Sequence, residues 1–154
     1  MAARIRRTIL LLVVAAAAVF AAWMLWPRSL AAAFDARGEL SVTVITSGVE
    51  GVDMTSRPCG DVERYAVEAG SPQAGAIEKC LEGYSYHLCW ESLTGESLIE
   101  DIGAVSVGLY GPEGDLSVFS GTGKARLNGR TVRLAGGRSA VLCEELTVLL
   151  RGEN

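Results

Sequence analysis

The sequence contains little of what most catalytic and metal sites require. It has one histidine, His87, so any histidine-based acid–base chemistry would depend on that residue alone. Its four cysteines include no C-x-x-C pair, which argues against the usual zinc spacing, a thioredoxin-like redox pair and covalent haem attachment. No G-x-S-x-G nucleophile motif is present. The sequence therefore predicts no catalytic residue, no metal site and no cofactor.

Basic residues are also few, with 14 Lys and Arg against 18 Asp and Glu and a net charge of −4. Nucleic-acid binding needs clustered Lys and Arg to neutralise phosphates, so a nucleic-acid partner is not expected. The stretch Gly121-Thr122-Gly123-Lys124 resembles part of a phosphate loop. A true P-loop has Ser or Thr after the lysine, whereas Ala125 follows here, so we interpret the stretch as a turn between two strands.

Acidic residues are absent from the first 34 positions, and residues 8–26 carry no charge at all. As a helix these 19 residues would span about 28 Å, close to the thickness of a bilayer core. Arg4, Arg6 and Arg7 precede the stretch, and Arg28 alone follows it closely. The positive-inside rule then predicts that residues 1–7 are cytoplasmic, that residues 8–26 cross the lipid bilayer, and that the rest is extracytoplasmic.

The alternative is a cleaved signal peptide, with Ala31-Ala32-Ala33 as its A-x-A site. Cleavage near Ala33 would release a secreted protein. The apolar core of such peptides usually has about 7–15 residues, so a 19-residue stretch favours an uncleaved single-pass anchor in the cell membrane. Either route exports the C-terminal domain.

Residues 27–38 are interpreted as a linker and residues 39–154 as one extracytoplasmic domain. Alternating apolar residues predict strands, Asn128-Gly129 predicts a hairpin turn, and the stretch 46–60 reads as a loop. Two helices are expected: one is capped by Ser71, begins at Pro72 and stops at Gly83, and one is capped by Ser139 and stops at Gly152. The predicted fold class is α+β, an antiparallel sheet of five or six strands with two helices. The expected strands lie at residues 40–45, 64–68, 84–90, 104–110, 116–120 and 130–134, and the last belongs to a hairpin that runs from about residue 124 to residue 134.

The four cysteines are Cys59, Cys80, Cys89 and Cys143. In an exported domain an even number of cysteines first suggests disulfides, here two bonds with three possible pairings. Free thiols, or a metal site that includes His87, are the alternatives.

Paired carboxylates and aromatic side chains are the remaining candidates for chemistry. Carboxylates in pairs could hydrolyse glycosides or bind calcium, but on loops and helix faces they are usually solvated surface. Aromatic residues on neighbouring strands could form a binding face, although such residues more often fill the core. The acidic groups are Glu96 with Glu100 and Asp101, Glu113 with Asp115, and Glu144 with Glu145; the aromatic residues are Tyr84, Tyr86, Trp90 and Tyr110.

The order of a Ser-Pro-led helix, Tyr84-Ser85-Tyr86-His87, a strand pair, Leu127-Asn128-Gly129-Arg130 and a terminal helix resembles small membrane-anchored extracytoplasmic proteins of Gram-positive bacteria that carry a domain of unknown function. The likeness covers roughly residues 65–151 and implies location and architecture, without any catalytic residue. From the anchor and the missing catalytic constellation we expect a non-enzymatic interaction or accessory module of an envelope complex, with a protein partner at the outer membrane surface. An extracytoplasmic hydrolase, or a protein that binds a small ligand or lipid, is the alternative.

Overall fold

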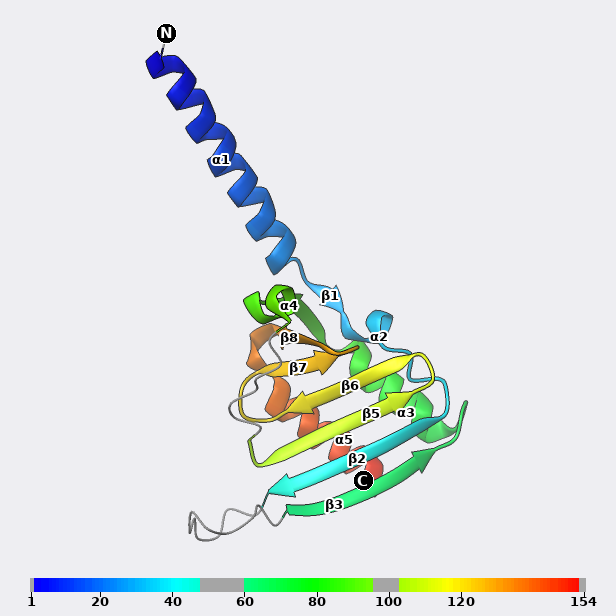
Figure 1. The fold of residues 1–154 in the computed structure, drawn as a ribbon. Coiled ribbons are helices and arrows are strands. Elements are labelled where there is room, and N and C mark those ends of the chain that lie inside the picture. The colour runs from blue at the N-terminus through cyan, green and yellow to red at the C-terminus, as the bar shows by residue number, and fades with distance from the viewer. Residues whose placement is uncertain (1, 48–59, 96–102, 153–154) are drawn as a thin grey trace, which may run out of the picture.

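The computed structural model describes residues 2–47, 60–95 and 103–152. A long helix, α1, leads into a domain that consists of one antiparallel sheet with helices packed on one face (Figure 1). This confirms the predicted α+β class. Cys59 and the acidic residues Glu96, Glu100 and Asp101 lie outside the described residues.

Helix α1 (Ala2–Leu25) is the apolar segment predicted from the sequence. Within it, Ile5–Leu25 has a mean hydropathy of 2.6 and is long enough to cross a membrane, and none of it is buried against the domain. An apolar helix exposed along its length is unfavourable in water, so α1 has the properties of a membrane anchor or a signal sequence.

The segment after α1 is part of the folded domain, although residues 27–38 were expected to be a linker. Strand β1 (Arg28–Ser29) pairs with β4 at the sheet edge, and the one-turn helix α2 (Leu30–Ala33) follows directly. Leu30, Phe34 and Ala36 are almost fully buried. The domain of the structure therefore begins at Arg28 rather than at residue 39, because this segment supplies side chains to the core.

The described part of the sheet has eight strands, more than the five or six expected, in the order β1-β4-β8-β7-β6-β5-β2-β3. All neighbours are antiparallel. The additional strands are β1 and the first arm of the Asn128-Gly129 hairpin, which the structure counts separately from the second arm. Asn128 and Gly129 both have positive φ, as a type I′ turn requires. The remaining strands are β2 (Leu40–Ser47), β3 (Gly60–Val67), β4 (Ser85–Leu88), β5 (Val105–Gly111), β6 (Gly114–Phe119), β7 (Lys124–Leu127) and β8 (Arg130–Leu134).

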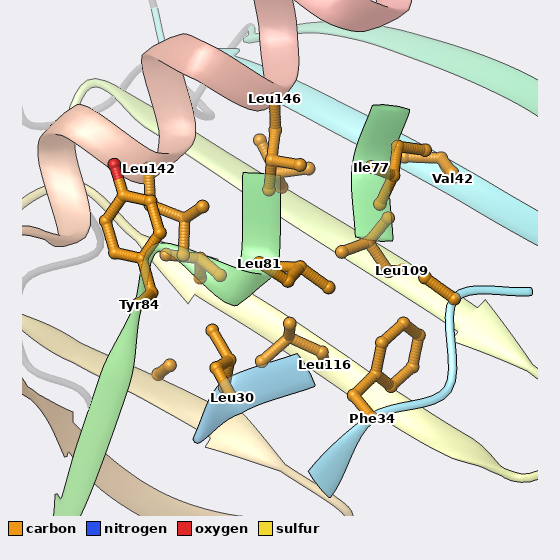
Figure 2. Close-up of a cluster of buried hydrophobic side chains, with 14 of the residues drawn as sticks. Leu30, Phe34, Val42, Ile77, Leu81, Tyr84, Leu109, Leu116, Leu142 and Leu146 are labelled. Atoms are coloured by element: carbon orange, nitrogen blue, oxygen red, sulfur yellow. The ribbon is translucent and has the colours of Figure 1, made fainter. Parts of the chain in front are cut away.

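The core lies between one sheet face and the helices α3 (Pro72–Glu82) and α5 (Ser139–Arg151). Alternate strand residues such as Val42, Leu109 and Leu116 are fully buried against this layer. Figure 2 shows that Leu30 points into the same cluster as the side chains of both helices. The labelled members of the cluster are Leu30, Phe34, Val42, Ile77, Leu81, Tyr84, Leu109, Leu116, Leu142 and Leu146.

Both predicted helices are present, but only the first is capped by the serine that the sequence predicted. Helix α3 begins as expected: Pro72 is its first residue, and the Ser71 Oγ accepts a hydrogen bond from the Ala74 N–H at 3.2 Å. Ser139, in contrast, does not cap α5. It is the first helical residue, fully buried, and its Oγ has no hydrogen-bond partner among the described residues. A 3-10 turn (Ala135–Gly137) leads into α5 instead, so the chain enters the helix through Arg138.

Candidate functional site

The three described cysteines lie in different environments and are not bonded to one another. Cys143 is buried in the core and Cys80 faces the groove between α3 and α5, whereas Cys89 follows β4. Two disulfides would use all four cysteines, so at least one bond would have to join two of these three. No such bond is present among these three, and with Cys59 outside the described residues the two disulfides stay a prediction.

Two of these thiols are strongly disfavoured as thiolates. Burial raises the pKa of Cys143 to about 12, and its Sγ donates to the Val118 carbonyl at 3.5 Å. Burial is the main cause that raises the pKa of Cys80 to about 12. The second cause is Glu145, whose carboxylate accepts a hydrogen bond from the Cys80 Sγ. The thiolate is the reactive form of cysteine, so neither residue has the properties of a nucleophile at neutral pH.

His87 lies on β4, half-buried, opposite Arg133 of β8. Its Nδ1 is 3.1 Å from the Leu88 carbonyl oxygen. No hydrogen bond joins it to a carboxylate, serine or cysteine of the described chain, so the structure does not bring together a nucleophile–histidine–carboxylate arrangement here. Nor do the described residues contain a group of three or more potential metal ligands.

Several of the described acidic residues are structural partners. Glu145 accepts from Cys80, and Glu91 forms an ion pair with Lys124, Nζ to Oε1 2.8 Å. Lys124 follows the Gly121-Thr122-Gly123 turn between β6 and β7. The ammonium group of this phosphate-loop-like stretch is therefore paired with the Glu91 carboxylate. The Lys124 hydrogen bond is the main cause that lowers the pKa of Glu91 to about 2.

The four aromatic candidates divide into two pairs. Tyr84 and Tyr86 are buried and belong to the core. Arg138 covers the Tyr84 ring, with its guanidinium carbon 4.6 Å from the ring centroid, and burial is the main cause that raises the pKa of Tyr84 to about 12. Trp90 and Tyr110 instead are exposed, to 66% and 48%. These two lie away from the helix layer and are the aromatic residues available for binding.

The sheet face opposite α3 and α5 is the largest feature that the core does not use. Within the described residues, the helix on this side is the short α4 (Trp90–Thr94), which contacts β8, while the faces of β2, β3, β5 and β6 point toward the viewer without a helix over them (Figure 1). We call this surface the open face. Its principal exposed or half-exposed side chains on β2, β3, β5, β6 and β7 are Ile45, Val62, Arg64, Tyr110, Asp115, Phe119 and Arg126, with Asp115 opposite Tyr110.

Strand register places these side chains on a common surface. Residues directly opposite in an antiparallel pair share a face, so the chain Arg64–Thr43–Gly108–Ser117–Arg126 forms one row across five strands. Arg64 and Arg126 are exposed at its two ends and pair with no carboxylate of the described chain. In the middle of the row Gly108 leaves room for Tyr110: a Cβ at Gly108 would come within 2.8 Å of the tyrosine hydroxyl. The ring of Tyr110 therefore lies along the open face.

Comparison with protein-family models, curated proteins and solved structures finds no match for this chain. The geometry alone thus identifies the open face as the candidate site. Sequence reasoning singled out Tyr110 but missed Arg64, Arg126, Ile45 and Val62. The period-2 alternation of the strands carried that signal, because residues out of phase with the core residues must point to the other face.

Proposed function

We propose that this chain is a non-enzymatic, membrane-anchored extracytoplasmic protein that acts as an accessory module of an envelope complex, binding a partner protein through the open face. The observation that carries the proposal is the direct fusion of the apolar helix to a sheet of which one face, among the described residues, is covered only by the short α4. Only Trp26 and Pro27 separate α1 from β1, and the buried Leu30 follows immediately. The domain is thereby held at the membrane with its binding surface exposed.

The orientation of the anchor follows from its flanking charges. Arg4, Arg6 and Arg7 precede the apolar stretch, and Arg28 is the basic residue next to its other end. Because basic residues are retained in the cytoplasm, the N-terminus is cytoplasmic and the sheet domain is extracytoplasmic. Trp23 and Trp26 then lie at the outer interface, where indole rings are enriched.

The packing after α1 favours an intact anchor over a cleaved leader. The A-x-A tripeptide Ala31-Ala32-Ala33 is coiled in α2, and the Leu30 N–H donates to the Tyr84 carbonyl at 3.0 Å. Proteases cut most readily in exposed, irregular segments. Cleavage after Ala33 would also remove β1 and a fully buried leucine, so the domain retains its core only if the leader stays attached.

The open face has the composition of a protein-binding surface. Arginine and tyrosine are enriched in interface cores. The Tyr110 ring extends over Gly108, in the middle of the row that ends in the two arginines, and Ile45 and Val62 occupy the next row. The chain from residue 35 on has a net charge of −8, yet the exposed charges at the two ends of the central row are Arg64 and Arg126. This local contrast favours a partner whose matching surface is apolar with acidic residues at its rim.

Site-specific crosslinking in the native membrane tests this proposal. A photoreactive amino acid replaces Tyr110 in the full-length protein, and the matched control places it at Val141, which is 42% exposed on the helix layer. A discrete crosslinked protein from position 110, absent from position 141 and weakened by Arg126→Glu but not by Lys79→Glu, would support the proposal. Equal labelling from both positions, or none from position 110, would contradict it.

A further inference from the structure

The short helix α4 exposes two large apolar side chains while its polar residues fasten it to the domain. Trp90 is 66% and Leu93 42% exposed, and their i, i+3 spacing places them on one side of the helix. Between them, Glu91 pairs with Lys124, and the Ser92 hydroxyl donates to the Thr131 carbonyl. The helix is thus held to β8 by its polar side, and an indole and an isobutyl group point away from the protein.

Strand register shows at which end of the sheet α4 lies. Arg28 pairs with Tyr86 and Ser29 with Ser85 in antiparallel register. The chain therefore enters β1 from α1 at the same end of the sheet at which it leaves β4 for α4. Only Cys89 separates β4 from α4, and adjacent strands are about 4.8 Å apart, so α4 begins within roughly 10 Å of the exit of α1. Figure 1 accordingly shows α4 next to the domain end of α1.

The end of α1 carries the residues that mark a membrane interface. Trp23 and Trp26 are exposed, and the Arg28 side chain turns back toward α1. Its Nη2 donates to the Trp23 carbonyl at 3.1 Å, and its guanidinium carbon is 5.5 Å from the Trp23 ring centroid. Tryptophan and arginine with this arrangement are typical of the headgroup region, and α4 lies at the same end of the sheet as Arg28.

We propose that α4 is a second membrane contact, with Trp90 and Leu93 inserted among the lipid headgroups beside α1. The inference rests on the proposed function, since it requires α1 to remain in the bilayer. Indole rings prefer the bilayer interface, and the occupant is a lipid surface because the apolar side of α4 continues the interface that α1 already forms. A second contact prevents the domain from rotating about α1 and fixes the angle at which the open face stands above the membrane.

The three tryptophans of the chain allow a direct test, because each proposal has its own reporter. The full-length protein is reconstituted into phosphatidylcholine–phosphatidylglycerol vesicles with and without brominated acyl chains, which quench tryptophan fluorescence on contact. One variant retains Trp90 (Trp23→Phe with Trp26→Phe), and another retains Trp23 (Trp26→Phe with Trp90→Phe). A third lacks all three natural tryptophans and carries Tyr110→Trp on β5, five strands from β1 and thus about 24 Å away.

Membrane docking of α4 predicts that brominated lipid quenches both Trp90 and Trp23 and leaves the β5 reporter bright. Quenching of Trp23 with an unquenched Trp90 would overturn the inference and leave the anchor intact; it is also the result expected if a protein partner, rather than lipid, covers α4 in the cell. An unquenched Trp23 would instead overturn the proposed anchor. Every replaced tryptophan is exposed, so each variant should fold, and circular dichroism verifies that it does.

Discussion

Replacing Leu30 by alanine is the sharpest test of the junction between α1 and the domain. Leu30 has no exposed surface and contacts the core that α3 and α5 build on the sheet. The change removes three carbon atoms, about 2.4 kcal/mol of transfer free energy at ~0.8 kcal/mol each. The cavity that remains adds to this, so the expected loss of unfolding free energy is about 3–4 kcal/mol, within the range of roughly 2–5 found for buried leucines.

The matched control is Leu25→Ala, the same chemical change five positions earlier. Leu25 is 64% exposed at the end of α1 and contacts lipid or detergent, so its replacement should alter the unfolding free energy of the domain by less than about 0.5 kcal/mol. Urea unfolding of the full-length protein in mild detergent, followed by near-ultraviolet circular dichroism of the buried Tyr84 and Tyr86, measures both values. Equal and small effects of the two substitutions would show that residues 28–33 are a linker and would contradict their assignment to the folded domain.

The same measurement bears on cleavage of the leader. A chain that begins at Phe34, the product of cleavage after Ala33, lacks β1 as well as Leu30. It should be less stable than the intact protein by at least the loss measured for Leu30→Ala. Since single domains are stable by about 5–15 kcal/mol, that loss would remove a large share of the stability of the shortened domain.

Three further predictions concern the interior of the domain. Glu91→Gln should lower the unfolding free energy by about 1–2 kcal/mol at pH 7, because the ion pair with Lys124 is partly buried. The pKa of Glu91 is lowered in the folded protein, so this stabilisation is present above the unfolded pKa near 4.5 and disappears as the pH falls toward 2. The urea midpoints of wild type and variant should therefore converge between pH 4.5 and pH 2. Cys143 should resist a thiol reagent at pH 8 in the folded protein and react fully in urea, with a rapid native reaction as the contrary result. Gly75→Ala, in α3 with open space around it, should raise the unfolding free energy by about 0.5–1 kcal/mol. Gly114→Ala should lower it by roughly 1–3 kcal/mol, because its Cβ would overlap the Asn128 side chain; a thermal melt of both variants checks the opposite signs.

Elements with local signals were predictable from the sequence. Helix α3 begins at Pro72, because Ser71 caps the helix and the proline preorganises its first turn. The hairpin of β7 and β8 turns at Asn128-Gly129 because both residues tolerate positive φ. Such signals act over a few residues and need no knowledge of the rest of the chain.

Elements without a local signal were missed. Arg28 and Ser29 become a strand only because β4, more than 50 residues later, offers its edge. Trp90 looked like the end of a strand, but the chain turns there into α4, where Ser92 bonds the Cys89 N–H and the Thr131 carbonyl. Both outcomes are decided by tertiary contacts that override local preference.

Only part of the open face could be predicted from the sequence. Strand alternation separates residues such as Arg64 and Tyr110 from the core set, but it does not tell which sheet face the helices will cover. That depends on α3 and α5 packing on the same side, a choice made by the hydrophobic stripes of both helices together. A binding surface formed by the absence of a covering layer has no motif of its own, which is why the sequence indicated the location of this protein more clearly than its site.

The position of the anchor at one end of the sheet limits where a partner can bind. Strand β1 lies at the exit of α1, and β3, at the opposite edge, is seven strand spacings away, about 34 Å. In the anchored arrangement that we propose, the open face covers this interval, with Arg126 on β7 nearer the end at which α1 leaves the domain and Arg64 on β3 at the far edge. A partner that contacts both arginines must therefore present its acidic rim within about 34 Å of the membrane surface. An integral membrane protein with a compact extracytoplasmic domain meets this condition, whereas a freely diffusing protein is not confined to that height.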